Sequence, residues 1–227
     1  MTSRLRVLRV VALLLLFGCV STHPAPGPAG NRDRHGPPDV ERYIRGLQRD
    51  ERVRELAPEQ VIDRLGIPPD AVVADLGSGP GVFTLPLARH LSRGLVYAVD
   101  VEPRQLDALR ARLLAEEISN VVPVLASYGN PHLPPAGVDW ILIVDTYHHL
   151  EDRVHYLRRL RSDLAAGGRI VILEYKSGPL PVGPPADHKL SRGQRAAELE
   201  EAGFHLVERR DSHRYHDLEV WQPTTNP

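Results

Sequence analysis

Short apolar runs alternate with amphipathic stretches between residue 71 and the end of the chain. Continuous apolar runs of this short length are typical of strands in a sheet that is covered on both faces. The predicted strands are Val72–Leu76, Val96–Val101, Val121–Ala126, Trp140–Val144 and Arg169–Glu174. The predicted helices, where apolar residues recur at helical spacing, are Val82–Leu91, Pro103–Glu117, Asp152–Leu164 and Ser191–Ala202. This alternation predicts a mostly parallel sheet.

Two further predicted strands near the C-terminus, Phe204–Arg209 and Asp217–Trp221, are separated by only a short connection. Strands joined this closely usually pair antiparallel, because a parallel pair needs a long crossover. We therefore expect an α/β fold with a Rossmann-like, seven-stranded, mostly parallel sheet. Helices would cover both faces, and one strand near the C-terminus would be antiparallel.

Helical periodicity also extends from Asp39 to about Leu65, ahead of the first predicted strand. Asp39 follows two prolines and belongs to the residue types that cap the N-terminus of a helix. A glycine and two prolines after Leu65 end this region. We expect residues 39–66 to form a helical cap within a single domain of residues 39–227.

The first 38 residues follow a different pattern. Basic residues precede the apolar run Val10–Gly18, so residues 1–18 have the pattern of a secretory signal peptide. The segment Leu16–Cys19 resembles a bacterial lipobox, which implies lipid attachment at Cys19, membrane anchoring and a location in the cell envelope. Residues 19–38 are rich in proline and glycine and predict a disordered tether. The alternatives are an anchor that is not cleaved and a cytoplasmic protein.

Length, net charge and cysteine content limit the domain size and the kinds of partner that we expect for this chain. The chain has 227 residues, which is enough for one α/β domain with a sizeable core. Its formal net charge of −1 argues against a broad electrostatic interaction with nucleic acid, so we expect no nucleic-acid partner. Cys19 is the single cysteine, which excludes a disulfide within the chain and a thiolate cluster for zinc. The sequence leaves the oligomeric state open.

The segment from Asp75 to Gly81, with glycines at 77, 79 and 81, follows the first predicted strand. Glycines let a ligand approach bare backbone, because they carry no side chain and tolerate positive φ. A helix that begins near Gly81 would direct its free N–H groups at the same place. The next strand ends at Asp100, whose carboxylate can accept two hydrogen bonds from a ribose diol.

These two motifs together resemble class I S-adenosylmethionine-dependent methyltransferases, over roughly residues 56–221. The resemblance implies S-adenosyl-L-methionine as the cofactor. The methionine end would lie at the glycine-rich segment and the ribose at the tip of the second strand. The residues assigned to the cofactor on this basis are Asp75, Gly77, Ser78, Gly79, Gly81, Asp100 and Val101.

A dinucleotide-binding Rossmann domain is the main alternative for the glycine-rich segment. Its fingerprint is G-x-G-x-x-G, whereas here the glycines stand at Gly77, Gly79 and Gly81. Asp75 would also place a negative charge near a pyrophosphate, which is unfavourable, whereas a carboxylate suits a sulfonium with its ammonium group. A turn that only joins a strand to a helix is the structural alternative.

The tips of the third and fourth strands complete the predicted cofactor site. Ser127 and Asn130 follow the third strand and have groups that can hydrogen-bond an adenine amine, although an aspartate is commonly expected there in the family. Asp145 follows the fourth strand and is also assigned to the cofactor. The histidine pair His148-His149 after it departs from the asparagine–proline signature of DNA and protein amide methyltransferases. It resembles the small-molecule branch near the ubiquinone and menaquinone C-methyltransferases.

Three residues are candidates for catalysis. His148 or His149 can take a proton from an acceptor, because the reference pKa of histidine lies near 6.5. Lys176 follows the fifth strand, at the same predicted ligand edge. The alternative for the histidine pair is that one ring packs under the cofactor and caps the helix at Asp152. No metal is expected, since no further ligand stands at a diagnostic spacing.

The proline-rich segment Ser177–His188 follows Lys176 and predicts either an acceptor-binding wall or a surface connection. Polar contacts to the acceptor would come from Lys176, Asp187, His188 and Lys189. The expected function is S-adenosylmethionine-dependent methyl transfer to a small-molecule or lipid-like acceptor. Two alternatives keep the fold: an aminopropyltransferase, and a membrane-tethered protein that binds S-adenosylmethionine without turnover.

Overall fold

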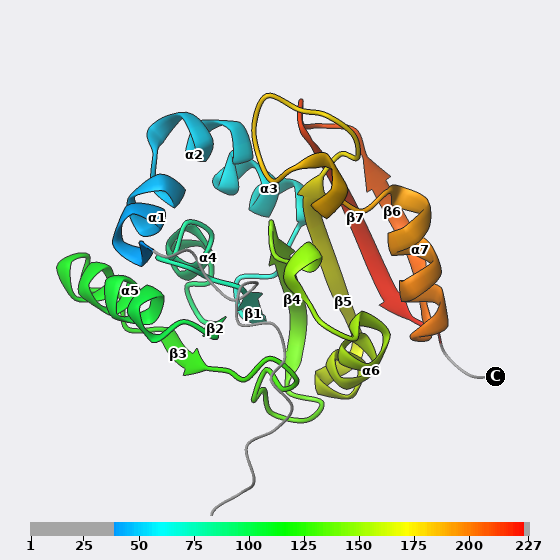
Figure 1. The fold of residues 1–227 in the computed structure, drawn as a ribbon. Helices are drawn as coiled ribbons and strands as arrows, with labels where there is room; N and C mark the ends of the chain where they lie inside the picture. The colour runs from blue at the N-terminus through cyan, green and yellow to red at the C-terminus, as the bar shows by residue number, and fades with distance from the viewer. Residues whose placement is uncertain (1–38, 225–227) are drawn as a thin grey trace, which may run out of the picture. The chain divides into compact units, whose positions relative to one another are not determined.

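A seven-stranded sheet in the order β3-β2-β1-β4-β5-β7-β6 organises the chain (Figure 1). The computed structural model describes residues 39–224. β7 pairs antiparallel with both β5 and β6, and the remaining neighbours pair parallel. The predicted α/β fold with one antiparallel strand near the C-terminus is therefore confirmed. The strands are β1 (Val72–Leu76), β2 (Leu95–Asp100), β3 (Val121–Leu125), β4 (Val138–Val144), β5 (Leu164–Tyr175), β6 (Phe204–Arg210) and β7 (His216–Pro223).

Helices cover both faces of this sheet. Alternate residues of each central strand point to opposite faces, so that Val73 and Ala74 of β1 enter different core clusters. One face packs against α3, α4 and α5, and the other packs against α6 and α7. The helices are α1 (Val40–Leu47), α2 (Asp50–Leu56), α3 (Pro58–Leu65), α4 (Thr84–His90), α5 (Pro103–Ala115), α6 (Arg153–Asp163) and α7 (Arg192–Glu201), with the short 3₁₀ helices η2 (Tyr147–His149) and η3 (Ala186–His188).

The N-terminal helical region consists of three short helices, α1, α2 and α3, and we call these three helices the N-terminal cap. Asp39 caps α1 as predicted, because its Oδ1 accepts a hydrogen bond of 2.9 Å from the backbone N–H of Arg42. α2 ends at Ala57, which has a φ of 45°. Pro58 follows at the first position of α3, where its missing N–H costs no helical hydrogen bond.

Several boundaries differ from the predicted ones. α4 begins at Thr84 rather than Val82, and β2 ends at Asp100, so Val101 lies outside the strand and is 39% exposed. β5 is much longer than predicted and begins at Leu164. The predicted signal peptide, tether and lipidation site lie outside the described residues. Within residues 39–224, no helix combines the length and apolar character that crossing a bilayer requires.

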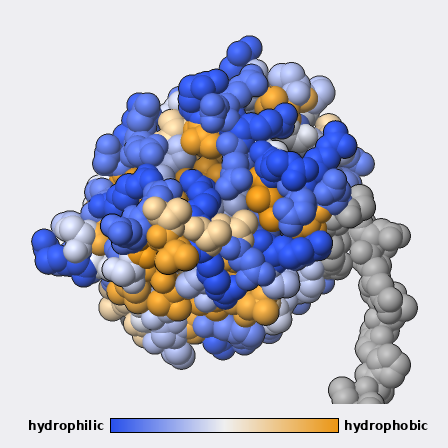
Figure 2. Space-filling view, turned by 90° about the vertical axis from the view of Figure 1, so that its left-hand side faces the viewer, coloured by the Kyte–Doolittle hydropathy of each residue, from blue (hydrophilic) through white to orange (hydrophobic). Residues whose placement is uncertain are grey.

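The surface on the side of α1 and α5 mixes hydrophilic and apolar areas (Figure 2). Exposed large apolar side chains on α5 and the edge strand β3 include Leu114, Val122 and Leu125. β3 also contains Pro123, which lacks an N–H group, so this edge of the sheet is a poor template for another strand.

Candidate functional site

Acidic side chains gather at the carboxyl ends of the parallel strands. Asp75 and Asp100 lie in the last two residues of β1 and β2, Asp145 directly follows β4, and Glu174 is the last residue but one of β5. The strand order reverses between β1 and β4, and ligands of open α/β sheets bind at such a point. The fold therefore brings the predicted strand-tip residues to one edge of the sheet.

The glycine-rich loop after β1 needs its glycines for conformation and for space. Gly77, Gly79 and Gly81 have φ values of 76°, 53° and 89°, in the region that favours glycine. A Cβ atom on Gly77 would lie 2.2 Å from Thr146 Oγ1, so the β1 and β4 loops touch here. A Cβ atom on Gly79 would lie 3.4 Å from Leu47 of α1. The N-terminal cap therefore reaches over this loop.

The backbone N–H groups of this loop are engaged within the protein. Those of Gly77 and Ser78 donate to the Val99 carbonyl oxygen at 2.8 and 3.0 Å. That of Gly79 donates to Asp100 Oδ2 at 2.8 Å. Strand β2 therefore supplies the acceptors for these three amides. The expectation that the N–H groups at the start of the following helix face the ligand stays a prediction, and that helix begins at Thr84.

This arrangement fits a cationic ligand better than a phosphate. A pyrophosphate is bound by free N–H donors, which the first three loop residues do not offer. A sulfonium with an ammonium group needs acceptors and negative charge, and three aspartates stand at neighbouring strand tips. Ser78 Oγ is buried with no hydrogen-bond partner in the described chain, so it is available to a ligand. The residues fit S-adenosyl-L-methionine.

Asp75 lies under the loop. Its side chain is 2% exposed, and Oδ2 accepts a hydrogen bond of 2.6 Å from Thr84 Oγ1 at the start of α4. Burial raises the pKa of Asp75 to about 6, against the Thr84 hydrogen bond, which lowers it. Asp75 therefore joins β1 to α4 directly, and its predicted contact with the methionine end stays a prediction.

Asp100 holds the loop from the side of β2. Its Oδ2 accepts from Gly79, and its Oδ1 accepts a hydrogen bond of 2.9 Å from the backbone N–H of Glu102. Burial raises the pKa of Asp100, against these two backbone donors. Each carboxylate oxygen retains a second lone pair for a diol. Val101 is exposed beside it.

The predicted adenine contacts lie in a tight turn after β3. Ser127 and Asn130 exchange backbone hydrogen bonds of 3.0 and 3.1 Å. The side-chain oxygen of Asn130 accepts from the backbone N–H of His132 at 2.9 Å. The amide nitrogen of Asn130 and the exposed hydroxyl of Ser127 are therefore the groups that an adenine could use here.

The histidine pair is held by the tip of β5. His148 Nδ1 lies 2.9 Å from Glu174 Oε2, and both side chains are buried, with 6% and 2% exposed. The same oxygen accepts from the backbone N–H of His148, and the other oxygen accepts from the N–H of Tyr175. The carboxylate is thus held in place, and it can orient the imidazole. No cap of the Asp152 side chain on α6 is found, and Asp152 has a φ of 39°.

His149 lies against its neighbour, with ring centroids 4.0 Å apart. Part of its side chain is exposed, yet partial burial of the imidazole and then the adjacent His148 lower the pKa of His149 to about 4. His149 is therefore neutral at neutral pH.

Asp145 is the centre of a charged cluster that joins the N-terminal cap to the sheet. Its Oδ2 accepts a hydrogen bond of 2.6 Å from Arg52 of α2, and His216 Nε2 of β7 lies 2.9 Å from its Oδ1. Burial alone would raise the pKa of Asp145, but His216 and Arg52 outweigh it and hold the pKa below its usual value. Asp145 has a φ of 49°, which is unusual for a residue other than glycine and typical of strained functional positions.

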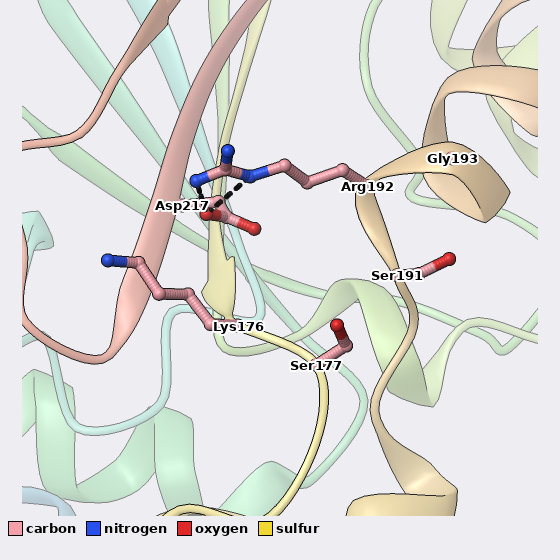
Figure 3. Close-up of a pocket in the computed structure, with 6 residues that line it drawn as sticks. All are labelled: Lys176, Ser177, Ser191, Arg192, Gly193 and Asp217. Carbon is pink, nitrogen blue, oxygen red and sulfur yellow. Dashed lines mark hydrogen bonds and ion pairs between the residues drawn. The ribbon is translucent and has the colours of Figure 1, made fainter.

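Lys176 lies in a different group of residues. Its Nζ is 2.9 Å from both Asp211 Oδ1 and the His213 carbonyl oxygen. It lines a hollow of about 380 Å³ at the end of β5 and the start of α7, in which Arg192 pairs with Asp217 (Figure 3). The remaining lining residues are Ser177, Ser191 and Gly193. The structure does not bring Lys176 into contact with the histidine pair, and its catalytic role stays a prediction.

The proline-rich segment after Lys176 is fastened to the sheet. Lys189 Nζ donates to the Gly178 carbonyl oxygen at 3.1 Å and lies 5.8 Å from the centre of the Tyr175 ring. A Cβ atom on Gly183 would lie 2.6 Å from that ring. Asp187 and His188 belong to η3 and are exposed.

Sequence reasoning missed three contributors to this site. Arg52 and Tyr43 come from the N-terminal cap. Burial raises the pKa of Tyr43, the Arg52 charge lowers it, and the Asp145 and Asp100 charges raise it further. Glu174 was visible as a strand-tip carboxylate, but its pairing with His148 was not predicted. Among residues 39–224, no group of three or more metal-binding side chains is arranged to hold an ion.

Comparison with known proteins agrees with this geometry. The family model described as "Methyltransferase domain" matches residues 74–170. The solved structure of a SAM-dependent methyltransferase from Aquifex aeolicus superposes with a TM-score of 0.76 at 23% identity, over 81% of this chain and 97% of that one. The structure of human N-acetylserotonin methyltransferase in complex with SAM superposes with a TM-score of 0.65 at 16% identity, over 82% and 57%.

Similar sequences with curated functions cover shorter regions. A tRNA(Phe) (4-demethylwyosine(37)-C(7)) aminocarboxypropyltransferase of Methanocaldococcus jannaschii is 30% identical over 37% of this chain and 39% of its own length. The (S)-coclaurine N-methyltransferase of Thalictrum flavum is 29% identical over 44% and 27%. The 27-O-demethylrifamycin SV methyltransferase of Amycolatopsis mediterranei is 24% identical over 62% and 56%.

The chain thus spans between about a quarter and a little over half of these relatives. The fold is that of SAM-dependent methyltransferases. The model of a methyltransferase domain matches residues 74–170, and the structural neighbours share the fold of the whole described domain.

Proposed function

We propose that this protein transfers a methyl group from S-adenosyl-L-methionine to a small-molecule acceptor with an ionisable hydroxyl or amine. The observation that carries the proposal is the buried His148–Glu174 pair at the same sheet edge as the glycine-rich loop. Two curated relatives are named as methyltransferases, one for nitrogen and one for a 27-O-demethyl compound, which supports a heteroatom acceptor.

His148 is the better placed of the two histidines to act as the base, because its imidazole lies against Glu174. If its Nδ1 donates to Glu174, its Nε2 presents a lone pair, and the carboxylate stabilises the imidazolium that forms. Glu174 is held by the backbone N–H of Tyr175, so the imidazole orientation is set before an acceptor binds. His149 stays neutral beside it and adds no competing charge.

The bound cofactor supplies a methyl group on a sulfonium, which is already a good leaving group. With the cofactor bound at the glycine-rich loop, the methyl carbon would pass to the acceptor oxygen or nitrogen, and the sulfur would keep the electron pair of the broken carbon–sulfur bond. The acceptor proton passes to His148 Nε2. The remaining work of the chain is alignment and exclusion of water, which the N-terminal cap over the glycine-rich loop supports.

Two alternatives on the same fold are less well supported. Aminopropyl transfer would need acids free to bind a polyamine, but Asp145 is already paired with Arg52 and His216. Binding of cofactor without turnover would leave the oriented His148–Glu174 pair without a role. The relation to the quinone C-methyltransferase branch rests on the histidine pair and stays a prediction.

The proposal is tested by incubating the purified full chain with methyl-labelled S-adenosylmethionine and small-molecule and lipid extracts of the source cells. We expect label in an extract compound with wild type. His148→Ala is expected to lower the rate about 10²- to 10³-fold, within the range for a lost general base, while affinity for S-adenosylhomocysteine changes less than twofold. His149→Ala is the matched control. A full rate in His148→Ala, or cofactor binding with no transfer to any extract, would contradict the proposal.

We also propose that Cys19 carries a lipid and that residues 19–38 tether the domain to a membrane of the cell envelope. The support is the segment Leu16–Cys19 after a basic and apolar leader. Cys19→Ser should move the protein from the membrane to the soluble fraction when cells are fractionated. Unchanged membrane association of Cys19→Ser would exclude a lipid at this residue.

A further inference from the structure

We infer that Arg52 binds the α-carboxylate of the cofactor, an inference that rests on the proposed function. It makes α2 of the N-terminal cap part of the cofactor site and gives the protein a means of selecting a ligand with an amino-acid end.

Two hydrogen bonds place Arg52 beside the glycine-rich loop. Its Nη2 donates to Asp145 Oδ2 at 2.6 Å, and Asp145 precedes Thr146, the residue that the loop touches at Gly77. Its Nη1 donates to the Leu47 carbonyl oxygen at 3.2 Å, and the Leu47 side chain reaches toward Gly79. The guanidinium therefore lies between the end of α1 and the tip of β4, next to the predicted place of the methionine end.

The charge of the ligand requires such a cation. The methionine end carries an ammonium and a carboxylate, and the charged residues assigned to the cofactor from sequence, Asp75, Asp100 and Asp145, are all acids. Arg112 of α5 also approaches the loop, but its Nη1 donates to the Pro80 carbonyl oxygen at 2.9 Å and so supports the loop itself. A guanidinium matches a carboxylate with two parallel hydrogen bonds, which makes Arg52 the suitable partner.

Arg52 can be shared with a ligand because Asp145 has a second neighbour, His216, at its other carboxylate oxygen. His216 Nε2 lies 2.9 Å from Asp145 Oδ1, yet neither atom is in hydrogen-bond geometry, and Glu55 Oε1 next to them is also unmatched. A small reorientation would pair His216 with Asp145 fully. The Arg52 side chain is 20% exposed, so part of it faces solvent.

The test compares two ligands that differ only in the carboxylate. S-adenosylhomocysteine and its decarboxylated analogue S-adenosyl-3-thiopropylamine are titrated calorimetrically into the full chain and into Arg52→Gln. We expect Arg52→Gln to lower the affinity for S-adenosylhomocysteine about ten- to hundredfold, as for a lost hydrogen bond to a charged group. Its affinity for the analogue should stay within twofold of wild type. Arg54→Gln, an exposed arginine of the same helix, is the matched control and should change neither.

Comparing the two ligands distinguishes carboxylate binding by Arg52 from a role of Arg52 in supporting the local fold. If Arg52→Gln loses the same affinity for both ligands, Arg52 only supports the fold of the site. If it loses affinity for neither ligand, Arg52 does not contact the cofactor. Both results overturn the inference. If wild type binds neither ligand, the proposed function itself fails, and that outcome is distinct from a failure at Arg52.

Discussion

At the scale of single residues, Asp75 shows how the fold keeps a carboxylate where water cannot reach it. The side chain is 2% exposed and has one side-chain partner, the Thr84 hydroxyl, within the described chain. Burial raises the pKa of Asp75 to about 6, so the folded state holds a proton that the unfolded chain releases near pH 4. The ionised form is therefore a stability cost at neutral pH.

The stability of wild type relative to Asp75→Asn should depend on pH. Between about pH 4 and pH 6 the folded state binds more protons than the unfolded state, so this group's contribution to stability falls as the pH rises. A shift of two pH units corresponds to at most ~3 kcal/mol. In urea unfolding, the free energy of unfolding of Asp75→Asn relative to that of wild type should rise by up to this amount as the pH increases. Above pH 7 it should rise no further. Asparagine keeps an acceptor for Thr84, so a difference that is constant with pH would contradict the raised pKa.

At the scale of elements, the β1–α4 loop is shaped by its contacts with β2 and β4. Its first amides are bound by β2, through Val99 and Asp100. Its Gly77 meets Thr146 after β4 without room for a Cβ atom. The loop is thus fixed by two neighbouring strands before a ligand arrives, which lowers the cost of ordering it on binding.

Gly77→Ala should therefore cost more stability than a glycine replaced at similar φ in open space. Gly66 has a φ of 65° and no neighbour within 4 Å of an added Cβ atom, so Gly66→Ala is the matched control. Backbone strain alone costs about 1–2 kcal/mol in either variant. The contact with the stiff Thr146 side chain should add about 1–3 kcal/mol for Gly77→Ala. Denaturant unfolding measures the loss of stability in both variants. Equal losses of stability would show that the Thr146 side chain moves aside at no cost.

The elements themselves were largely predictable, because the apolar period differs between strands and helices. All seven strands lie where the apolar runs predict them, and β7 is antiparallel because its connection from β6 is short. The long β5 was not predicted, since Gly167 and Gly168 lie where its pairing with β4 shifts register, between Leu164 and Arg169. The break between α2 and α3 depends on Ala57, whose left-handed conformation is not predicted by any side-chain pattern.

At the scale of the whole molecule, the site combines parts that sequence shows and parts that only the fold brings together. The strand-tip acids follow from the α/β pattern, since parallel strands end at one edge. The contact of Arg52 with Asp145 joins residues 93 positions apart, and that of His148 with Glu174 joins residues 26 apart. Contacts of this kind depend on how the cap and loops pack, and periodicity carries no information about them.

We expect the adenosine and sulfonium of S-adenosylmethionine to bind over the glycine-rich loop, between the tips of β1 and β2. Calorimetric titration of the full chain with S-adenosylmethionine and with NAD tests it most directly. We predict that wild type binds S-adenosylmethionine and not NAD, and that Asp100→Ala loses about 1–3 kcal/mol of binding free energy through the ribose diol. Binding of NAD instead, or an unchanged affinity for S-adenosylmethionine in Asp100→Ala, would contradict the account.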